Sequence, residues 1–265
     1  MGEFLVKRAK ALQAMLAVLG VLVLSGLGAT TAAAQADRVT VAVAANFAAP
    51  MKAIVADFER QSGYQVSASF GATGQFYAQI RHGAPFDVLL AGDSSTPTLL
   101  KQEGHAVAKT QFTYATGRLV LWSATPGLVD SQGLVLQSDR FKKIALANPK
   151  LAPYGVAAVE VIEHLGLEQA LRPRFVQAAN IGQTFHFVAS GNADLGFVAL
   201  SQVFADGKIK EGSGWLIPAS YYTPIQQDAI LLVGAQNNRA ALAFLEYLTS
   251  DVGKQIIESF GYEVP

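Results

Sequence analysis

The stretch VTVAVAANF, residues Val39–Phe47, determines how the rest of the chain is organised. Its apolar, β-branched residues predict a buried strand that ends at a small polar corner, Ala45-Asn46. A helical pattern follows at once, because apolar residues recur at 3.6-residue spacing as far as Phe58. A parallel strand that turns directly into a helix leaves the free N–H groups of that helix at the carboxyl edge of the sheet, which favours anion binding.

The first 36 residues have the features of a secretory signal peptide. A basic segment at Lys7–Lys10 precedes the apolar run Leu12–Leu27, and Ala34–Ala36 has the small-x-small pattern of a cleavage site. A membrane anchor is the alternative, but the run is short and rich in small residues. We therefore expect residues 1–36 to be removed and the mature protein to be periplasmic.

Composition restricts the partners of the mature chain. Without residues 1–36 the chain has 229 residues, with 17 basic and 19 acidic side chains and a net charge of −2. This balance, with no cluster of Lys or Arg, argues against nucleic acid or an anionic membrane surface as a partner. Because the sequence has no cysteine, it offers neither a cysteine-linked lipid nor a disulfide framework. We expect a monomer without stable membrane insertion.

The remaining pattern alternates strands and helices in two successive sets, which predicts an α/β fold with parallel strands. Expected strands cover residues 39–45, 64–70, 86–91, 118–123, 143–147, 175–179, 194–199 and 229–233. Expected helices cover residues 47–58, 75–81, 98–103, 156–165, 184–190, 239–248 and 252–260. No linker separates the sets, so we expect two lobes with a cleft between them. Lobe I comprises residues 37–116 plus 228–265, and lobe II comprises residues 117–227.

Four corners follow expected parallel strands and should meet at the edge where α/β sheets bind ligands. They are Ala45-Asn46, Ala72-Thr73, Pro153-Tyr154 and Asn180-Ile181-Gly182. They offer backbone N–H groups, an amide, a hydroxyl and a phenol, and no charged side chain except the nearby Lys150. Donors without carboxylate acceptors suit an oxyanion that carries no proton.

Each corner also has a simpler interpretation. Asn46 and Thr73 are residue types that cap helices. Tyr154 could be a half-buried packing residue with its hydroxyl in water, and Gly182 could serve only a turn. It is their shared position at one sheet edge that favours a binding site.

Longer segments of the chain resemble the periplasmic molybdate-binding proteins of ABC importers. They are VAVAANFAAPM, SFGATGQFYAQIRHGAPFDVLLAGD, LANPKLAPYG, NIGQTFHFVASGNADLGFVALSQ, FLEYL and IIESFGY. The resemblance covers nearly all of the mature chain, in order. It implies two Rossmann-like lobes joined by a hinge, the type II periplasmic binding protein architecture, with molybdate or tungstate bound in the interlobe cleft and delivered to a membrane permease.

The resemblance also implies the site. The contacts of the first lobe fall on Asn46, with Ala45 as a lesser candidate, and on Thr73, while those of the second lobe fall on Tyr154 and Ile181, with Gly182 as a lesser candidate. Many members have a tyrosine after the strand that corresponds to LGFV, where this chain has Ala199; Tyr154 then supplies the phenol. The metal is bound as its oxyanion, so neither direct metal coordination nor a cofactor is expected.

Three other functions remain to be compared. A ferric-ion binder could use Tyr221-Tyr222, but iron also favours His or carboxylate ligands, and this pair is expected in a return strand near the hinge. A receptor for another oxyanion, such as sulfate, would differ mainly in cavity size. For an enzyme, the sequence offers no recognisable catalytic motif. Asp93 is the best candidate for a catalytic carboxylate, and its simpler role is in a turn or a helix cap. We therefore expect a binding protein and not an enzyme.

Overall fold

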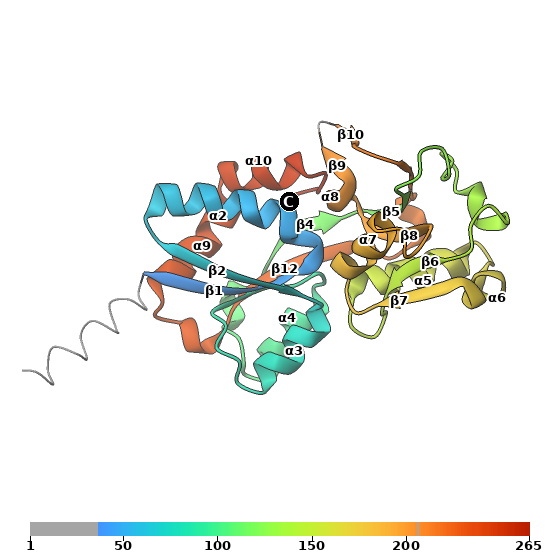
Figure 1. The fold of residues 1–265 in the computed structure, drawn as a ribbon. Helices are drawn as coiled ribbons and strands as arrows, with labels where there is room; N and C mark the ends of the chain where they lie inside the picture. Colours follow the sequence, from blue (N-terminus) through green and yellow to red (C-terminus); the bar gives the residue numbers. More distant parts are fainter. Residues whose placement is uncertain (1–36, 206) are drawn as a thin grey trace, which may run out of the picture.

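The computed structural model describes residues 37–205 and 207–265, so the signal peptide expected at residues 1–36 lies outside the described residues. The described chain forms two α/β lobes, each built around a five-stranded sheet (Figure 1). None of the helices in these ranges has the length and apolar character that a membrane span requires.

The sheet of lobe I has the strand order β2-β1-β3-β12-β4. Its strands are β1 (Arg38–Ala44), β2 (Gln65–Gly71), β3 (Val88–Leu90), β4 (Phe112–Gly117) and β12 (Ile225–Leu231). Its helices are α2 (Ala48–Ser62), α3 (Thr73–Arg81), α4 (Ser95–Gln102), α9 (Arg239–Thr249) and α10 (Asp251–Ser259), with the 3-10 turns η1 (Ala45–Phe47), η2 (Ala108–Thr110) and η6 (Val233–Ala235). Strand β1 runs parallel to β2 and β3, whereas β12 runs antiparallel to β3 and β4.

Both faces of strand β1 are covered, as its apolar sequence predicts. Val39, Val41 and Val43 pack on one face into the core formed with α2, α9 and α10. Ala42 packs on the other face into the core that includes residues of α3 and α4. Successive side chains of a strand point to opposite faces, so an apolar run without alternation fits a sheet buried on both sides.

The sheet of lobe II has the strand order β11-β5-β8-β6-β7. Its strands are β5 (Leu119–Ser123), β6 (Ile144–Ala147), β7 (Phe175–Ala178), β8 (Leu195–Ala199) and β11 (Ser213–Leu216), and β9 (Phe204–Ala205) pairs separately with β10 (Lys208–Ile209). Its helices are α5 (Pro153–His164), α6 (Glu168–Leu171), α7 (Ile181–Ala189) and α8 (Leu200–Val203), with the 3-10 turns η3 (Leu134–Gln137), η4 (Arg172–Arg174) and η5 (Ala219–Tyr221). Strand β6 runs parallel to β7 and β8.

The chain passes between the two sheets twice, from β4 to β5 at residues 117–119 and from β11 to β12 at residues 216–225. The sequence analysis had no strand at β4. It also expected Tyr221 and Tyr222 in a return strand, and that expectation is wrong, because Tyr221 ends η5 and Tyr222 lies in a loop. Pro218 and Pro224 flank this segment, and proline cannot donate to a strand ladder.

Several helices begin earlier than their apolar periodicity predicts, among them α5 and α7, which reach the pocket. Helix α5 begins at Pro153 and not at residue 156, and α7 begins at Ile181 and not at residue 184. The residues that the sequence analysis treated as corners before these helices are therefore their first turns. This shift matters because the first turn of a helix carries its unpaired N–H groups.

Candidate functional site

The four expected corners meet in one small pocket between the lobes. Strands β1 and β2 are parallel neighbours in lobe I, and β6 and β7 are parallel neighbours in lobe II, so each pair ends at one sheet edge. The pocket holds about 210 Å³ of space not occupied by atoms, part of it open to solvent. Its lining comes from both lobes and contains no charged side chain: Ala44, Ala45, Asn46, Gly71, Ala72, Thr73, Ala152, Pro153, Tyr154, Asn180 and Ile181.

Five of the six candidate residues line this pocket, namely Ala45, Asn46, Thr73, Tyr154 and Ile181. All five have at most 9% of their surface exposed. The sixth candidate, Gly182, lies next to the pocket lining, since a Cβ atom built on it would be 3.3 Å from the Cβ atom of Ala45 in the other lobe.

Three helices, α3, α5 and α7, direct their N-termini at the pocket, and two of them have no side-chain cap. The N-cap residues of α3 and α5 are Ala72 and Ala152, which have no side-chain acceptor. Among the hydrogen bonds of the described residues, none involves the backbone N–H of Thr73, Tyr154 or Ile181. These amides, together with the positive ends of the helix dipoles, form a site for an anion.

The third of these helices, α7, is capped only in part. The Oδ1 atom of Asn180 accepts from the backbone N–H of Gln183 at 2.9 Å. This bond satisfies the third residue of the helix and leaves the first two N–H groups, those of Ile181 and Gly182, toward the pocket side.

Thr73 is not the helix cap that its residue type allowed. It is the first residue of α3, and its Oγ1 atom accepts from the backbone N–H of Gly92 at 2.9 Å. A hydroxyl that accepts one hydrogen bond still has its own hydrogen to donate. Thr73 can therefore present both its amide and its hydroxyl to a ligand.

Asn46 is not a cap either, and its side chain is engaged within the protein. The Nδ2 atom donates to Oε1 of Gln227 at 2.7 Å and to the hydroxyl of Tyr262 at 2.9 Å. Both hydrogens of the side-chain amide are thus used on protein acceptors. The donor that Asn46 has left for a ligand is its backbone N–H.

The phenol of Tyr154 is fully buried, so the interpretation with a hydroxyl in water does not hold. Its hydroxyl accepts from Nε2 of Gln227 at 3.3 Å, and the residue is only 2% exposed. Burial raises the pKa of this phenol well above its usual value, with a further contribution from Tyr262 and Tyr114. The hydroxyl therefore stays protonated at neutral pH and adds no negative charge near the pocket.

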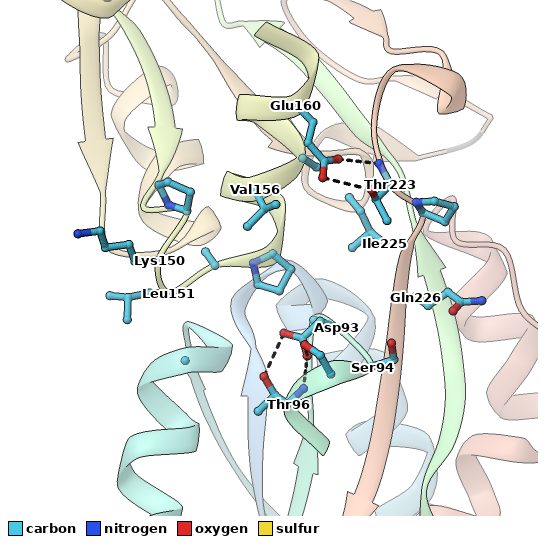
Figure 2. A pocket seen from close by; sticks show the side chains of 18 residues that line it. Asp93, Ser94, Thr96, Lys150, Leu151, Val156, Glu160, Thr223, Ile225 and Gln226 are labelled. Atoms are coloured by element: carbon cyan, nitrogen blue, oxygen red, sulfur yellow. Dashed lines mark hydrogen bonds between the residues drawn. The ribbon is translucent and has the colours of Figure 1, made fainter. Parts of the chain in front are cut away.

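A larger cleft lies beside the small pocket, between the lobes and next to β12 (Figure 2). It holds about 1010 Å³ of space, part of it open to solvent. Its two carboxylates are engaged locally, because Asp93 accepts from the backbone N–H of Thr96 at 2.6 Å and Glu160 accepts from that of Thr223 at 2.6 Å. The cleft has two carboxylates against one lysine, Lys150, and this charge and its large size make it a poor match for a small anion. Asp93 serves the start of α4.

The two tyrosines of the pair have separate partners within the protein. The hydroxyl of Tyr222 accepts from the backbone N–H of Leu119 at 3.1 Å, and the ring of Tyr221 stacks on His164 at 4.0 Å. Within residues 37–205 and 207–265, no group of three or more His, Cys, Asp or Glu side chains is placed to hold a metal ion.

Gln227 is a residue of this region that the sequence pattern did not single out. It is fully buried and contacts two candidate residues, Asn46 and Tyr154. Its local sequence, IQQDAIL, carries no motif. The available signal was the two-residue alternation of a strand, which places Gln227 on the same face as the apolar residues Ile225 and Ala229.

Comparisons with known proteins agree with this geometry. The family described as bacterial extracellular solute-binding protein matches residues 39–263. The molybdate-binding protein ModA of Azotobacter vinelandii is 54% identical over 237 residues, which cover 89% of this chain and 94% of that protein. The ModA protein of Rhodobacter capsulatus is 48% identical over 229 residues, covering 86% and 89%. The solved structure of the Azotobacter vinelandii periplasmic molybdate-binding protein matches with a TM-score of 0.83 and 42% identity, over 86% of this chain and 99% of that one.

Proposed function

The chain belongs to the bacterial extracellular solute-binding proteins, within their molybdate-binding branch, and we propose that it holds molybdate or tungstate as a tetrahedral oxyanion in the small pocket between its lobes. It has the two-lobed type II fold and serves as the solute-binding component of a molybdate ABC importer. The observation that carries the proposed site is the convergence of three helix N-termini, two of them without a side-chain cap, on an uncharged pocket.

We assign the oxyanion contacts mainly to backbone amides. Thr73, Tyr154 and Ile181 supply N–H groups from α3, α5 and α7, and the Thr73 hydroxyl adds a further donor. Asn46 and Ala45 contribute the amides of η1, and Gly182 that of the second residue of α7. We assign the contact of Tyr154 with the oxyanion to its backbone N–H and not to its phenol, because the phenol hydroxyl accepts from Nε2 of Gln227.

This donor set selects against protonated anions. An oxyanion that carries a hydrogen needs an acceptor, and the pocket lining has no carboxylate to supply one. Phosphate carries such a hydrogen at neutral pH, whereas molybdate, tungstate and sulfate do not. Between the last three, size must decide, so the small volume of the closed pocket is the second element of selectivity.

Capture requires the lobes to close over the anion. We propose that lobe I (residues 37–116 plus 228–265) and lobe II (residues 117–227) move about the two chain crossings as a hinge. One direct contact across the cleft is the hydrogen bond from the backbone N–H of Gly74 to the backbone oxygen of Leu151, at 3.0 Å. The mature protein then acts in the periplasm as a monomer without a cofactor, presenting the closed form to the permease, and captures its ligand without chemical turnover.

Calorimetric titration of the mature protein with molybdate, tungstate, sulfate and phosphate tests this function. We expect tight, one-to-one binding of molybdate or tungstate and much weaker binding of phosphate. A phosphate affinity within tenfold of molybdate, a difference of only ~1.4 kcal/mol, would contradict a site made of donors alone. Preferred binding of sulfate would retain the donor site and change the assigned ligand.

A further inference from the structure

A buried network of polar side chains lies directly behind the pocket and joins both lobes to the hinge. Its members are Asn46, Tyr114, Tyr154, Ser201, Gln227 and Tyr262. Each is at most 7% exposed. Burying six polar side chains is costly unless they are hydrogen-bonded, and in this network every member has a partner.

Gln227 is the centre of this network. Its Oε1 atom accepts from Asn46 Nδ2 at 2.7 Å and from the hydroxyl of Tyr114 at 3.1 Å, and its Nε2 atom donates to the hydroxyl of Tyr154 at 3.3 Å. One side chain therefore holds a residue of η1 in lobe I and a residue of α5 in lobe II. Residues of both elements line the pocket.

The same side chain belongs to the hinge. Gln227 lies in β12, where the pairing with β4 shifts register and leaves Tyr114 of β4 without an opposite residue. Such a bulge turns side chains away from the regular ladder. At the end of β4, a Cβ atom built on Gly117 would lie 2.0 Å from the Tyr154 hydroxyl and 2.6 Å from Nε2 of Gln227. The hinge backbone is thus packed against the network with no room for a side chain.

A second connection between the lobes fixes the backbone of Asn46. The Oγ atom of Ser201, in lobe II, donates to the backbone oxygen of Asn46 at 2.8 Å. The hydroxyl of Tyr262 lies 3.0 Å from the same oxygen and 2.9 Å from Ser201 Oγ, so its single hydrogen can be donated to either. The chain after α10 brings Tyr262 here, because Glu263 pairs with Thr116 beside the hinge.

We propose that Gln227 is a positioning residue for anion capture: from the hinge strand it aligns Asn46 and Tyr154, whose backbone amides face the pocket. This inference rests on the proposed function of the pocket. Gln227 is the last residue before the lobe boundary at residue 228, and its strand, β12, pairs in the lobe I sheet. Its bond to Tyr154 of α5 and the bond from Ser201 to Asn46 therefore each join elements of the two lobes, and they form only when the lobes are together. The network therefore stabilises the closed, ligand-holding state and slows release of the anion.

The test replaces Gln227 by methionine, which has a similar length and cannot form these hydrogen bonds. Stopped-flow and calorimetric measurements with sodium molybdate should show dissociation faster by roughly tenfold or more, on the scale of one to two lost hydrogen bonds, with association within about twofold of wild type. Gln226→Met is the matched control, because Gln226 is the exposed neighbour on the same strand. It should leave both rates unchanged.

Tyr154→Phe removes the hydroxyl from the other end of the same bond and gives a second route if Gln227→Met does not fold. The double variant should lose little more than either single variant, because residues that act through one contact are not additive. Unchanged dissociation in both single variants would overturn the inference, as would a lower ligand-free melting temperature with unchanged molybdate affinity. Failure of the wild-type protein to bind molybdate or tungstate would instead refute the proposed function.

Discussion

The helices of this protein begin in two different ways. At the pocket, α3 and α5 follow Ala72 and Ala152, which cannot cap a helix with a side chain. Far along the chain, α9 and α10 follow Asn238 and Ser250, whose side-chain oxygens accept from the backbone N–H groups of residues 241 and 253. Two helices at the pocket thus begin without a side-chain cap, whereas α9 and α10 are capped, as α7 is by Asn180.

A capped helix start contributes to the stability of the fold, whereas an uncapped start leaves N–H groups for a ligand. A side-chain cap stabilises a helix by about 0.5–2 kcal/mol, so an uncapped start forgoes that stability in the ligand-free protein. The unused N–H groups remain available for an anion, which then completes the helix in place of a side chain. In the proposed site, the alanines that precede α3 and α5 therefore favour binding by leaving these N–H groups unused.

The largest effect is expected from Ala72→Asp, which gives α3 a charged cap inside the pocket. Two unit negative charges about 4 Å apart repel by about 4 kcal/mol at an effective dielectric constant of 20, so molybdate affinity should fall about a thousandfold. The melting temperature of the ligand-free protein should not fall, because the new carboxylate caps α3. Calorimetry and thermal unfolding measure the two quantities, and an affinity within tenfold of wild type would contradict the account.

A smaller loss is expected from Gly74→Ala, in the first turn of α3. A Cβ atom at Gly74 would lie 3.1 Å from Cα of Leu151 and 3.2 Å from its backbone oxygen, across the cleft. Such overpacking costs about 1–3 kcal/mol, which only the closed state incurs, so affinity should fall about tenfold or more while ligand-free stability is maintained. Gly234→Ala is the control, because its Cβ atom would meet nothing within 4 Å. Equal affinities of the two variants would show that closure does not need this approach.

The capped helices should behave in the opposite way. Ser250→Ala removes the oxygen that accepts from the backbone N–H of Gly253 at 3.2 Å. Unfolding should become easier by about 1 kcal/mol, a fall in melting temperature of about 2–4 °C for a chain of this size. Molybdate affinity should not change. A loss of affinity beyond about threefold would show that α10 influences the site and would weaken the contrast between the two regions.

The smallest effect is expected from pH. Burial raises the pKa of Tyr114, Tyr154 and Tyr262, so the fold favours their neutral form. The stability that this contributes is present below the unfolded phenol pKa of about 10 and is lost only as the pH rises above it. Molybdate affinity should therefore stay constant between about pH 6 and 9 by calorimetry. A fall by more than about threefold in that range would mean that a titrating group contributes to the site.

The sequence predicted correctly that the four corners meet, because their positions depend on topology. Strand β1 is recognisable from its apolar run, and the residues after β1, β2, β6 and β7 meet because parallel strands end at one edge. The expected starts of α5 and α7 were three residues too late. Periodicity detects the buried face of a helix, whereas Tyr154 and Ile181 lie in first turns that line the pocket.

The orientation of side chains could not be predicted in the same way. Asn46 is a good helix cap by residue type, but its amide turns to Gln227 and Tyr262, which lie 181 and 216 positions further along the chain. No local pattern contains that information. The position of the Tyr154 hydroxyl likewise depends on Gly117 and Gln227 at the hinge. Such partners become known only from the folded chain.

The most direct test of the central claim is a crystal structure of the mature protein with bound molybdate. The account predicts the anion in the small pocket, with the backbone nitrogen atoms of Thr73, Tyr154 and Ile181 each about 2.7–3.2 Å from an oxygen of the anion. An anion in the larger cleft beside Lys150, or one in the pocket whose oxygens contact side chains and none of these three amides, would contradict it.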